Sequence, residues 1–233
     1  MKTVHFVRHG ETEQNKNGIW QGHTNTQLSK IGKAQAKLLS DRLNLKNQTV
    51  FTSDLARAKE TAYFLSDSPT VRENLREINV GDFTGKSVKK TYSNNLDIFD
   101  ALQDDTYVFP NGESVQEFKQ RVHQEVDYIF DNIDEDSECI VVTHGFFIGT
   151  AIGLVLGFNQ YPYPIGNIQN TSVSTVIKRD SVMQVNKFND AIHLPNSYID
   201  YPAKDKSRIL TFIRHGQTDS NTQGVWQGHV DNP

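Results

Sequence analysis

Short apolar strands alternate with amphipathic helices along residues 1–190, and this alternation restricts the fold more than any other feature. β-branched and aromatic residues predict strands at 3–7, 49–52 and 139–143. Apolar residues spaced by threes and fours predict helices at 31–43, 115–133 and 146–156. The order of these elements predicts an α/β fold with a mostly parallel central sheet and helices on both of its faces.

Capping residues mark where the helices start. Ser114 and Glu117 form an S-x-x-E capping box, and Ser29 precedes the helix that begins near residue 31. Ser53 or Asp54 is expected to cap a helix that follows the strand at 49–52. Residues 172–177 and 182–188 are predicted to form the two strands of a hairpin, and the four polar residues 178–181 are predicted to connect them.

Two histidines follow predicted strands directly. His9 comes after the first strand, and His144 comes after the strand at 139–143. Ligands of open α/β sheets bind beyond the carboxyl ends of the strands. The pattern therefore predicts that both histidines meet in one crevice.

The composition indicates a soluble globular protein. Of the 233 residues, 36% are hydrophobic and 22% are charged, and the net charge is −4. The chain has no long basic run, so we expect neither a nucleic-acid nor a membrane partner. Its longest apolar stretch, 146–156, is shorter than the roughly 20 residues that span a bilayer. The N-terminus lacks a secretory apolar core, so the expected location is cytoplasmic.

The single cysteine, Cys139, excludes an intrachain disulfide and fits a reducing compartment. It enters an apolar strand and is expected to be a small buried hydrophobic residue rather than a reactive thiol.

One segment of the chain occurs twice. The sequence FVRHGET at residues 6–12 returns as FIRHGQT at 212–218, and ten residues between Arg8 and His23 match at a constant offset of 206. We expect a domain at 1–195, a linker at 196–207 and the truncated start of a second copy at 208–233. The second copy carries counterparts of the first histidine motif only.

Three explanations of the second copy stay open. It is part of a longer tandem protein, a natural remnant, or a strand that pairs with an exposed sheet edge or replaces the first strand in a neighbouring molecule. In the third case, deleting residues 208–233 would change the oligomeric state or the melting temperature.

Four motifs occur in a fixed order. They are RHGET at 8–12 with Asn15, S-x-L-x-R-A-x-x-T at 53–61, L-R-E-x-x-x-G-x-x-x-G at 75–85, and THG at 143–145. Together they resemble the histidine phosphatase superfamily, which has the phosphoglycerate-mutase-like fold. The resemblance covers about residues 2–190.

The resemblance implies a role for each motif residue. His9 is the expected nucleophile that accepts the phosphoryl group, and Glu77 is the expected proton donor to the leaving group. The phosphate pocket is expected to consist of Arg8, Arg57 and His144, with Asn15 as a further contact. The predicted substrate-binding set also includes Gly145, Gln21 and Gly22.

These residue types suit phosphoryl transfer on physical grounds. Guanidinium groups match phosphate oxygens, and a neutral imidazole is a competent nucleophile near pH 7 because its unperturbed pKa is about 6.5. An alkoxide leaves poorly unless a carboxylic acid protonates it. Each role has a candidate, so the sequence predicts neither a metal site nor a cofactor.

Several residues keep a second interpretation. Glu73 and Asp82 are acids close to Glu77 in the sequence and are alternative candidates for the proton donor. Trp20 is as compatible with a packing role as with a role in the wall of the substrate site. His23 is expected on a loop surface. Three other histidines have no supporting context: His5, His123 and His193. The family resemblance implies that residues 86–111 form part of a lid over the pocket.

The predicted activity is hydrolysis of a small phosphorylated metabolite, with a phosphoglycerate-type mutase as the first alternative. Mutases of the family have a longer segment between the acid motif and the second histidine, whereas Glu77 and His144 are only about 67 residues apart. A non-catalytic phosphate-binding module is the third hypothesis. The identity of the substrate and the formation of a homo-oligomer stay open.

Overall fold

A computed structural model describes residues 1–43, 48–93, 104–158 and 167–198. Residues Met1–Asp200 form one compact unit. The second copy of the histidine motif at 208–233, most of the predicted linker and residues 94–103 of the predicted lid lie outside the described residues. Asn196–Tyr198, the first three residues of that linker, form a 3-10 turn, η3.

The fold is built on one six-stranded sheet with the strand order β3-β2-β4-β1-β5-β6. The first four strands in this order run parallel, while β5 and β6 are antiparallel to their neighbours. The prediction of a mostly parallel sheet is therefore confirmed. The strands are β1 (Lys2–Arg8), β2 (Thr49–Ser53), β3 (Thr70–Arg72), β4 (Glu138–Thr143), β5 (Val173–Arg179) and β6 (Val182–Asp190).

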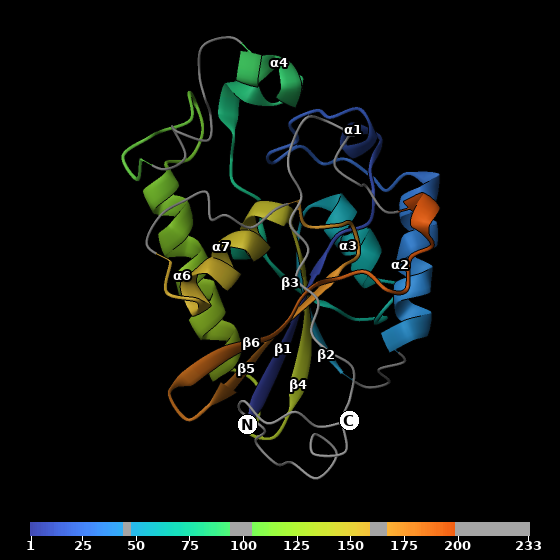
Figure 1. The fold of residues 1–233 in the computed structure, drawn as a ribbon, viewed down its shortest axis with the longest axis vertical. Coiled ribbons are helices and arrows are strands. Elements are labelled where there is room, and N and C mark those ends of the chain that lie inside the picture. The colour runs from blue at the N-terminus through green and yellow to red at the C-terminus, as the bar shows by residue number, and fades with distance from the viewer. Residues whose placement is uncertain (44–47, 94–103, 159–166, 199–233) are drawn as a thin grey trace, which may run out of the picture. The chain divides into compact units, whose positions relative to one another are not determined.

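Helices cover both faces of the sheet, as predicted. Figure 1 shows α6 and α7 on one side, α2 and α3 on the other, and α1 and α4 beyond the end of the sheet opposite the N-terminus. The helices are α1 (Glu13–Lys16), α2 (Lys30–Leu43), α3 (Ala56–Ala62), α4 (Val88–Ser93), α6 (Val115–Asp131) and α7 (Gly145–Val155). Two further 3-10 turns are η1 (Glu73–Leu75) and η2 (Gly81–Phe83).

The central strands bury side chains on both faces, which explains their continuous apolar sequences. Phe6 of β1 belongs to the apolar cluster that contains the buried residues of α6 and α7. Its neighbour Val7 belongs to a second cluster with Leu39 of α2 and Ala58 of α3. Because β1 is covered on both sides, its carboxyl end is held rigidly where the histidine motif begins.

Two of the three predicted helix caps are confirmed. Ser114 and Glu117 form the reciprocal capping box of α6, and Ser29 Oγ accepts a hydrogen bond from Gly32 N at 3.0 Å. The third prediction was wrong, because Leu55 precedes α3 and makes no side-chain cap. Ser53 is the last residue of β2, and the Asp54 carboxylate is paired with the Arg76 guanidinium instead.

The hairpin exists, but its turn is tighter than predicted. Strand β5 continues to Arg179, so only Asp180 and Ser181 connect it to β6. Asp180 adopts a φ of 52°, a conformation that Asp tolerates better than most residues. The strand propensity of the flanking residues therefore outweighs the polarity of residues 178–179.

Cys139 is fully buried in β4, as expected. Burial raises the pKa of its thiol to about 12, so the thiolate is not accessible near neutral pH. The residue acts as a small apolar side chain of the core.

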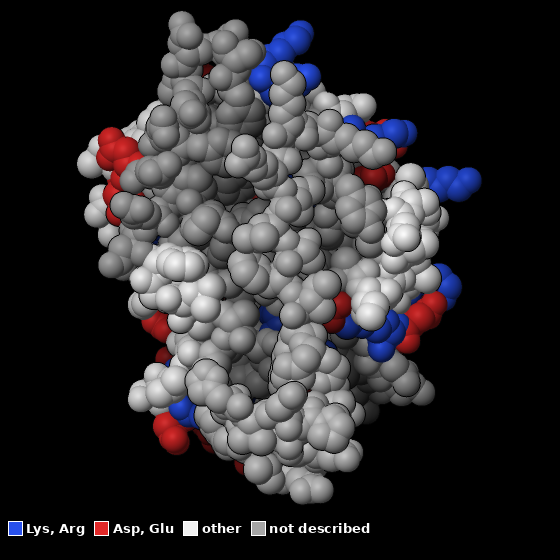
Figure 2. All heavy atoms as spheres, viewed as in Figure 1, with Lys and Arg blue, Asp and Glu red and all other residues white. Residues whose placement is uncertain are grey.

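The surface of the described residues carries charges of both signs. On the face seen in Figure 2, basic and acidic side chains lie scattered around the margin. Among the described helices, none combines the length and apolarity that a membrane crossing requires.

Candidate active site

His9 and His144 lie side by side because β1 and β4 are neighbouring parallel strands. Arg8 pairs with Thr143 in the register, so the next residue of each strand is one of the two histidines. His9 N donates to the Thr143 carbonyl at 2.9 Å. The centroids of the two imidazole rings are 5.1 Å apart, with an interplanar angle of 60°.

A backbone contact orients the ring of His9. Its Nδ1 lies 2.7 Å from the Gly10 carbonyl oxygen, which can only accept a hydrogen bond. Nδ1 therefore carries the proton of the neutral ring, and Nε2 keeps its lone pair. The tautomer required of a nucleophile at Nε2 thus follows from the contact between His9 and Gly10.

The surroundings of both histidines favour the neutral imidazole. Burial lowers the pKa of His9 well below 6.5, and the charges of Arg57 and Arg8 lower it further. Burial, Arg57 and the neighbouring His9 lower the pKa of His144 in the same way. An uncharged His9 retains the lone pair that a nucleophile needs.

Arg57 is almost completely enclosed, with 1% of its surface exposed. Nη1 donates to the Thr24 carbonyl at 2.7 Å, and Nη2 donates to the Gly22 carbonyl at 2.8 Å. Burial lowers its pKa to about 10, while the charge of Glu77 raises it. Its Nε has no hydrogen-bond partner among the described residues, so the buried Nε–H group is an unused donor.

The other cation, Arg8, lies at the end of β1 beside the start of α7. Its Nη1 donates to the Ile168 carbonyl. A Cβ atom on Gly145 would lie 3.5 Å from Arg8 Nε, so the glycine borders the guanidinium directly. Arg8 also contributes to the pKa shifts of His9, His144 and Glu77, which places its charge in the same site.

The carboxylate of Glu77 binds the start of α7. Oε2 accepts from Phe146 N at 3.1 Å, and Oε1 accepts from Ile78 N at 3.1 Å. Burial raises the pKa of Glu77, although these N–H groups and the charges of Arg57 and Arg8 oppose the shift. A carboxyl group with a raised pKa is suited to act as a general acid.

The alternative acids lie elsewhere. Glu73 is 76% exposed and lies near Arg76. Asp82 accepts two hydrogen bonds from the Asn111 side chain on the surface. The charges of Arg57 and Arg8 act on the pKa of Glu77, so Glu77 is the acid that belongs to the site.

Three predicted substrate-binding residues mainly support the loop around the site. Asn15 uses Oδ1 to accept from the backbone and hydroxyl of Thr12. Gln21 is buried, and its Oε1 accepts from the hydroxyls of Thr12 and Thr26. Gly22 contributes its carbonyl to Arg57. The amide nitrogens of Asn15 and Gln21 take no part in these hydrogen bonds, and an amide nitrogen can donate to a phosphate.

His23 is not a simple surface residue, which corrects the prediction. It is half-buried, and its Nε2 lies 2.7 Å from the Glu77 carbonyl oxygen. Arg121 also donates to that carbonyl, at 3.3 Å, and forms an ion pair with Glu113. Local sequence gave no sign of this contact, because the partners are 54 and 44 residues from Glu77.

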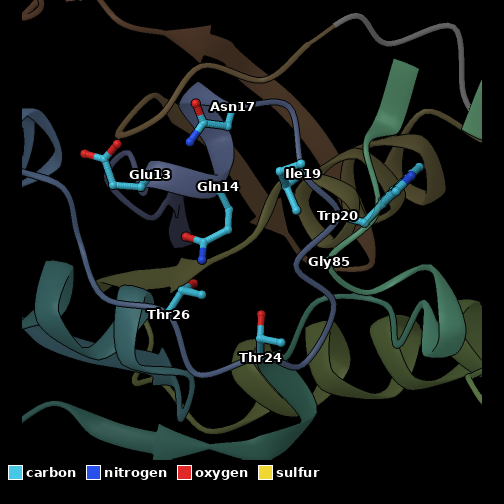
Figure 3. Close-up of a pocket in the computed structure, with 8 residues that line it drawn as sticks. All are labelled: Glu13, Gln14, Asn17, Ile19, Trp20, Thr24, Thr26 and Gly85. Atoms are coloured by element: carbon cyan, nitrogen blue, oxygen red, sulfur yellow. The ribbon is translucent and has the colours of Figure 1, made fainter. Parts of the chain in front are cut away.

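Trp20 is both a packing residue and a cavity wall. Its indole stacks on Phe146 with a centroid distance of 5.9 Å. It also borders a cavity of about 360 Å³, into which Gln14 extends toward Thr24 and Thr26 (Figure 3). The described lining residues are Glu13, Gln14, Asn17, Ile19, Trp20, Thr24, Thr26 and Gly85.

This cavity lies next to the cluster of His9, His144, Arg8, Arg57 and Glu77 without containing it. The two histidines, both arginines and Glu77 are not among its described lining residues. The link between the two is Thr24, whose carbonyl holds Arg57.

Part of the predicted lid is packed on the core. Phe109 is 1% exposed, and its ring meets Phe83 and Tyr107 edge to face. Residues 88–93 form α4, while 94–103 lie outside the described residues.

Two motif residues have structural roles that the sequence did not reveal. Ser53 Oγ lies 3.0 Å from His144 Nε2. Thr61 Oγ1 accepts from Gly10 N at 2.9 Å and donates to the Arg57 carbonyl at 2.8 Å. Both residues belong to the motif at 53–61, which marked them as candidates for a functional role. Their hydrogen-bond partners are evident only from the fold.

Within the described ranges, no three His, Cys, Asp or Glu side chains are grouped so that they could hold a metal ion. The site instead combines two guanidinium groups, two neutral imidazoles and one half-buried carboxyl group. This combination can bind an anion, present a nucleophile and supply a proton.

Comparison with known families agrees with this chemistry. The model of the histidine phosphatase superfamily (branch 1) matches residues 4–191. A probable phosphoglycerate mutase, GpmB, of Erwinia tasmaniensis is 29% identical over 212 residues, which cover 86% of this chain and 98% of that protein. A metal-independent phosphoserine phosphatase of Arabidopsis thaliana is 31% identical over 199 residues, covering 81% of this chain and 82% of that protein.

A solved structure has the same fold. A phosphoserine phosphatase mutant of Entamoeba histolytica, in complex with phosphoserine, superimposes with a TM-score of 0.71 at 26% identity. The similarity covers 84% of this chain and all of that chain.

Proposed function

This chain belongs to the histidine phosphatase superfamily, and we propose that it is a metal-independent phosphomonoesterase acting on a small phosphorylated metabolite. The observation that carries the proposal is the 2.7 Å contact between His9 Nδ1 and the Gly10 carbonyl, which leaves Nε2 as the nucleophilic nitrogen. This nitrogen belongs to a site with two arginines and a protonatable carboxyl group. The relatives named as phosphatases support the hydrolytic class.

In the first step, Nε2 of His9 forms a bond to phosphorus while the bond from phosphorus to the ester oxygen breaks. Glu77 gives its proton to the departing oxygen, so that an alcohol leaves rather than an alkoxide. The phosphorylated ring becomes cationic, and its Nδ1–H bond to Gly10 then gains strength as a charge-assisted hydrogen bond.

Two buried nitrogen atoms support the binding of an anion: Arg57 Nε as a donor, and His144 Nδ1 as a donor in the tautomer in which Ser53 donates to Nε2. Arg57 Nε and His144 Nδ1 are buried and have no partner among the described residues. Buried polar groups are normally satisfied, and the oxygens of a phosphoryl group would provide the missing acceptors. Arg8 and Arg57 neutralise the charge on these oxygens during transfer.

In the second step, the Glu77 carboxylate takes a proton from water, and the water oxygen attacks phosphorus. The bond between phosphorus and Nε2 breaks, inorganic phosphate leaves, and both His9 and Glu77 return to their starting states. One residue thus acts as acid and then as base.

A phosphoglycerate-type mutase is the second candidate, favoured by the similarity to the Erwinia protein. A mutase would return the phosphoryl group to a bound alcohol instead of to water. A non-catalytic phosphate-binding module is the weaker third candidate, because the chain retains every residue that the chemistry uses.

Turnover of p-nitrophenyl phosphate in the presence of EDTA tests the proposal. We expect vanadate-sensitive release of phosphate that the His9→Ala substitution abolishes. Turnover unaffected by that substitution would refute the role of His9, and no turnover of any ester in a phosphate ester panel would favour the binding module. Isomerisation of phosphoglycerate faster than its hydrolysis would favour the mutase.

A further inference from the structure

Thr171 has an unusual backbone conformation next to the nucleophile. It is completely buried and has a φ of 58°. A β-branched residue rarely occupies this left-handed region, because its Cβ substituents crowd the backbone. Such strain persists only where the surrounding structure enforces it, and it concentrates at functional sites.

The two peptide groups that flank His9 are bound at all four of their polar atoms. The Arg8 carbonyl accepts from Thr171 N at 2.9 Å, and the His9 N–H donates to the Thr143 carbonyl at 2.9 Å. On the other side, the His9 carbonyl accepts from Asn170 Nδ2 at 2.8 Å, and Gly10 N–H donates to Thr61 Oγ1 at 2.9 Å.

Asn170 and Thr171 thus donate hydrogen bonds to the carbonyl groups of His9 and Arg8. They precede β5, whose antiparallel ladder with β1 ends at the pair Val7 and Val173. In its left-handed conformation, Thr171 donates its N–H to the carbonyl of Arg8, the last residue of β1, beyond the end of the ladder.

A chain of side chains behind Thr171 stabilises its conformation. Thr171 Oγ1 lies 3.1 Å from His193 Nε2, and His193 Nδ1 lies 3.2 Å from Arg42 Nη1. An arginine can only donate, so Nδ1 is the acceptor and Nε2–H donates to the Thr171 hydroxyl. Arg42 is fixed in turn by Asp190, with Nη1 and Oδ1 3.2 Å apart.

We propose that Asn170 and Thr171 are positioning residues for the nucleophile, which hold the carbonyls on both sides of His9 and so fix the line along which Nε2 attacks phosphorus. The inference rests on the proposed role of His9. With both peptide planes bound and Nδ1 held by Gly10, the ring has little freedom to leave the attack direction. Neither residue needs to touch the substrate.

The decisive variant is Asn170→Ala, which removes one donor to the His9 carbonyl. Its matched control is Asn132→Ala, because Asn132 Nδ2 also donates to a backbone carbonyl at 2.8 Å, at the end of α6. Both lose one amide-to-carbonyl hydrogen bond, but only one of these bonds holds the nucleophile.

The measurement is rapid-quench trapping of the phosphorylated protein with p-nitrophenyl phosphate. Asn170→Ala should slow phosphorylation of His9 by about 10- to 100-fold, the cost of a small misplacement of a reacting group. The inhibition constant of inorganic phosphate should stay within about threefold, because Arg57 and His144 keep their contacts. Asn132→Ala should change neither value.

A second pair of variants tests the backbone of Thr171. Thr171→Asn keeps the N–H group and tolerates the left-handed region, so phosphorylation should stay within about threefold of the parent rate. Thr171→Val keeps the branched Cβ but loses the contact with His193, so phosphorylation should slow by about tenfold or more. The reverse order would overturn the inference, as would an unchanged rate for Asn170→Ala.

The controls separate this inference from the proposed function. If His9→Ala retains full turnover, the proposed function fails. If His9→Ala is inactive while Asn170→Ala phosphorylates at the parent rate, only the positioning role fails. Parallel losses in phosphate binding and melting temperature for Asn170→Ala would assign the residue a purely structural role and would also overturn the inference.

Discussion

Ser53 Oγ lies 3.0 Å from His144 Nε2, although the two residues are 91 positions apart. The same oxygen accepts from Leu55 N at 3.3 Å, so its hydroxyl hydrogen is available to His144. If Ser53 donates to Nε2, the neutral imidazole carries its proton on Nδ1. In that tautomer an uncharged His144 presents an N–H donor at Nδ1.

Replacing Ser53 with alanine should lower kcat/KM by about tenfold, equivalent to roughly 1.4 kcal/mol, because His144 loses the contact that selects its tautomer. Steady-state hydrolysis of p-nitrophenyl phosphate measures the effect. Thr150→Val is the control, since the buried Thr150 hydroxyl has no partner among the described residues and its loss should not affect activity. Equal effects of both substitutions would contradict the role of Ser53.

Substituting Glu77 with glutamine should reveal the general acid through the leaving group. Hydrolysis of an alkyl phosphate should slow by about 10²- to 10⁴-fold, because the alkoxide then leaves without a proton. Hydrolysis of p-nitrophenyl phosphate should slow less, since nitrophenolate is a stable anion. An equal loss for both esters would indicate that Glu77 positions the substrate instead.

The pH dependence of kcat/KM should have two limbs with different origins. Activity requires neutral His9, whose lowered pKa keeps it uncharged below pH 6.5, and protonated Glu77, whose raised pKa keeps its proton above pH 4.5. Activity should therefore fall on the acidic side as His9 gains a proton and on the alkaline side as Glu77 loses one. The Glu77→Gln variant should lack the alkaline limb, and its persistence would assign that limb to another group.

Acidification should destabilise the fold through the half-buried His193. The pKa of His193 is lowered to about 4 from 6.5, chiefly by burial and then by the charge of Arg42. The unfolded chain binds this proton first, so the contribution to stability is present above pH 6.5 and is lost as the pH falls toward 4. Urea unfolding at several pH values measures the slope, and His193→Gln should make it shallower. An unchanged slope would contradict the shifted pKa.

Two helical glycines should respond to alanine in opposite directions. A Cβ on Gly32 would lie 2.1 Å from the Glu11 carbonyl oxygen, so Gly32→Ala should destabilise the protein by about 1–3 kcal/mol. A Cβ on Gly149 would meet Ile168 at an ordinary 3.9 Å, so Gly149→Ala should stabilise it by about 0.5–1 kcal/mol. Thermal unfolding checks both values, and a stable Gly32→Ala variant would contradict the close approach of α2 to the histidine loop.

The sequence alone was sufficient for the fold class and for the meeting of His9 with His144. Hydrophobic periodicity is local, so it identifies strands and helices, and ligands of parallel sheets lie at the carboxyl ends of the strands. The capping box of Ser114 was equally readable, because both partners lie within four residues.

Only the tertiary structure decided which groups support those histidines. Ser53 was expected to cap a helix, yet the neighbouring order of β2 and β4 places it against His144. His23 was expected on the surface, yet it binds the backbone of Glu77. Asn170 reaches the His9 carbonyl across 161 residues because β5 lies beside β1. Such partners depend on strand order and on backbone angles such as that of Thr171, which local propensity does not encode.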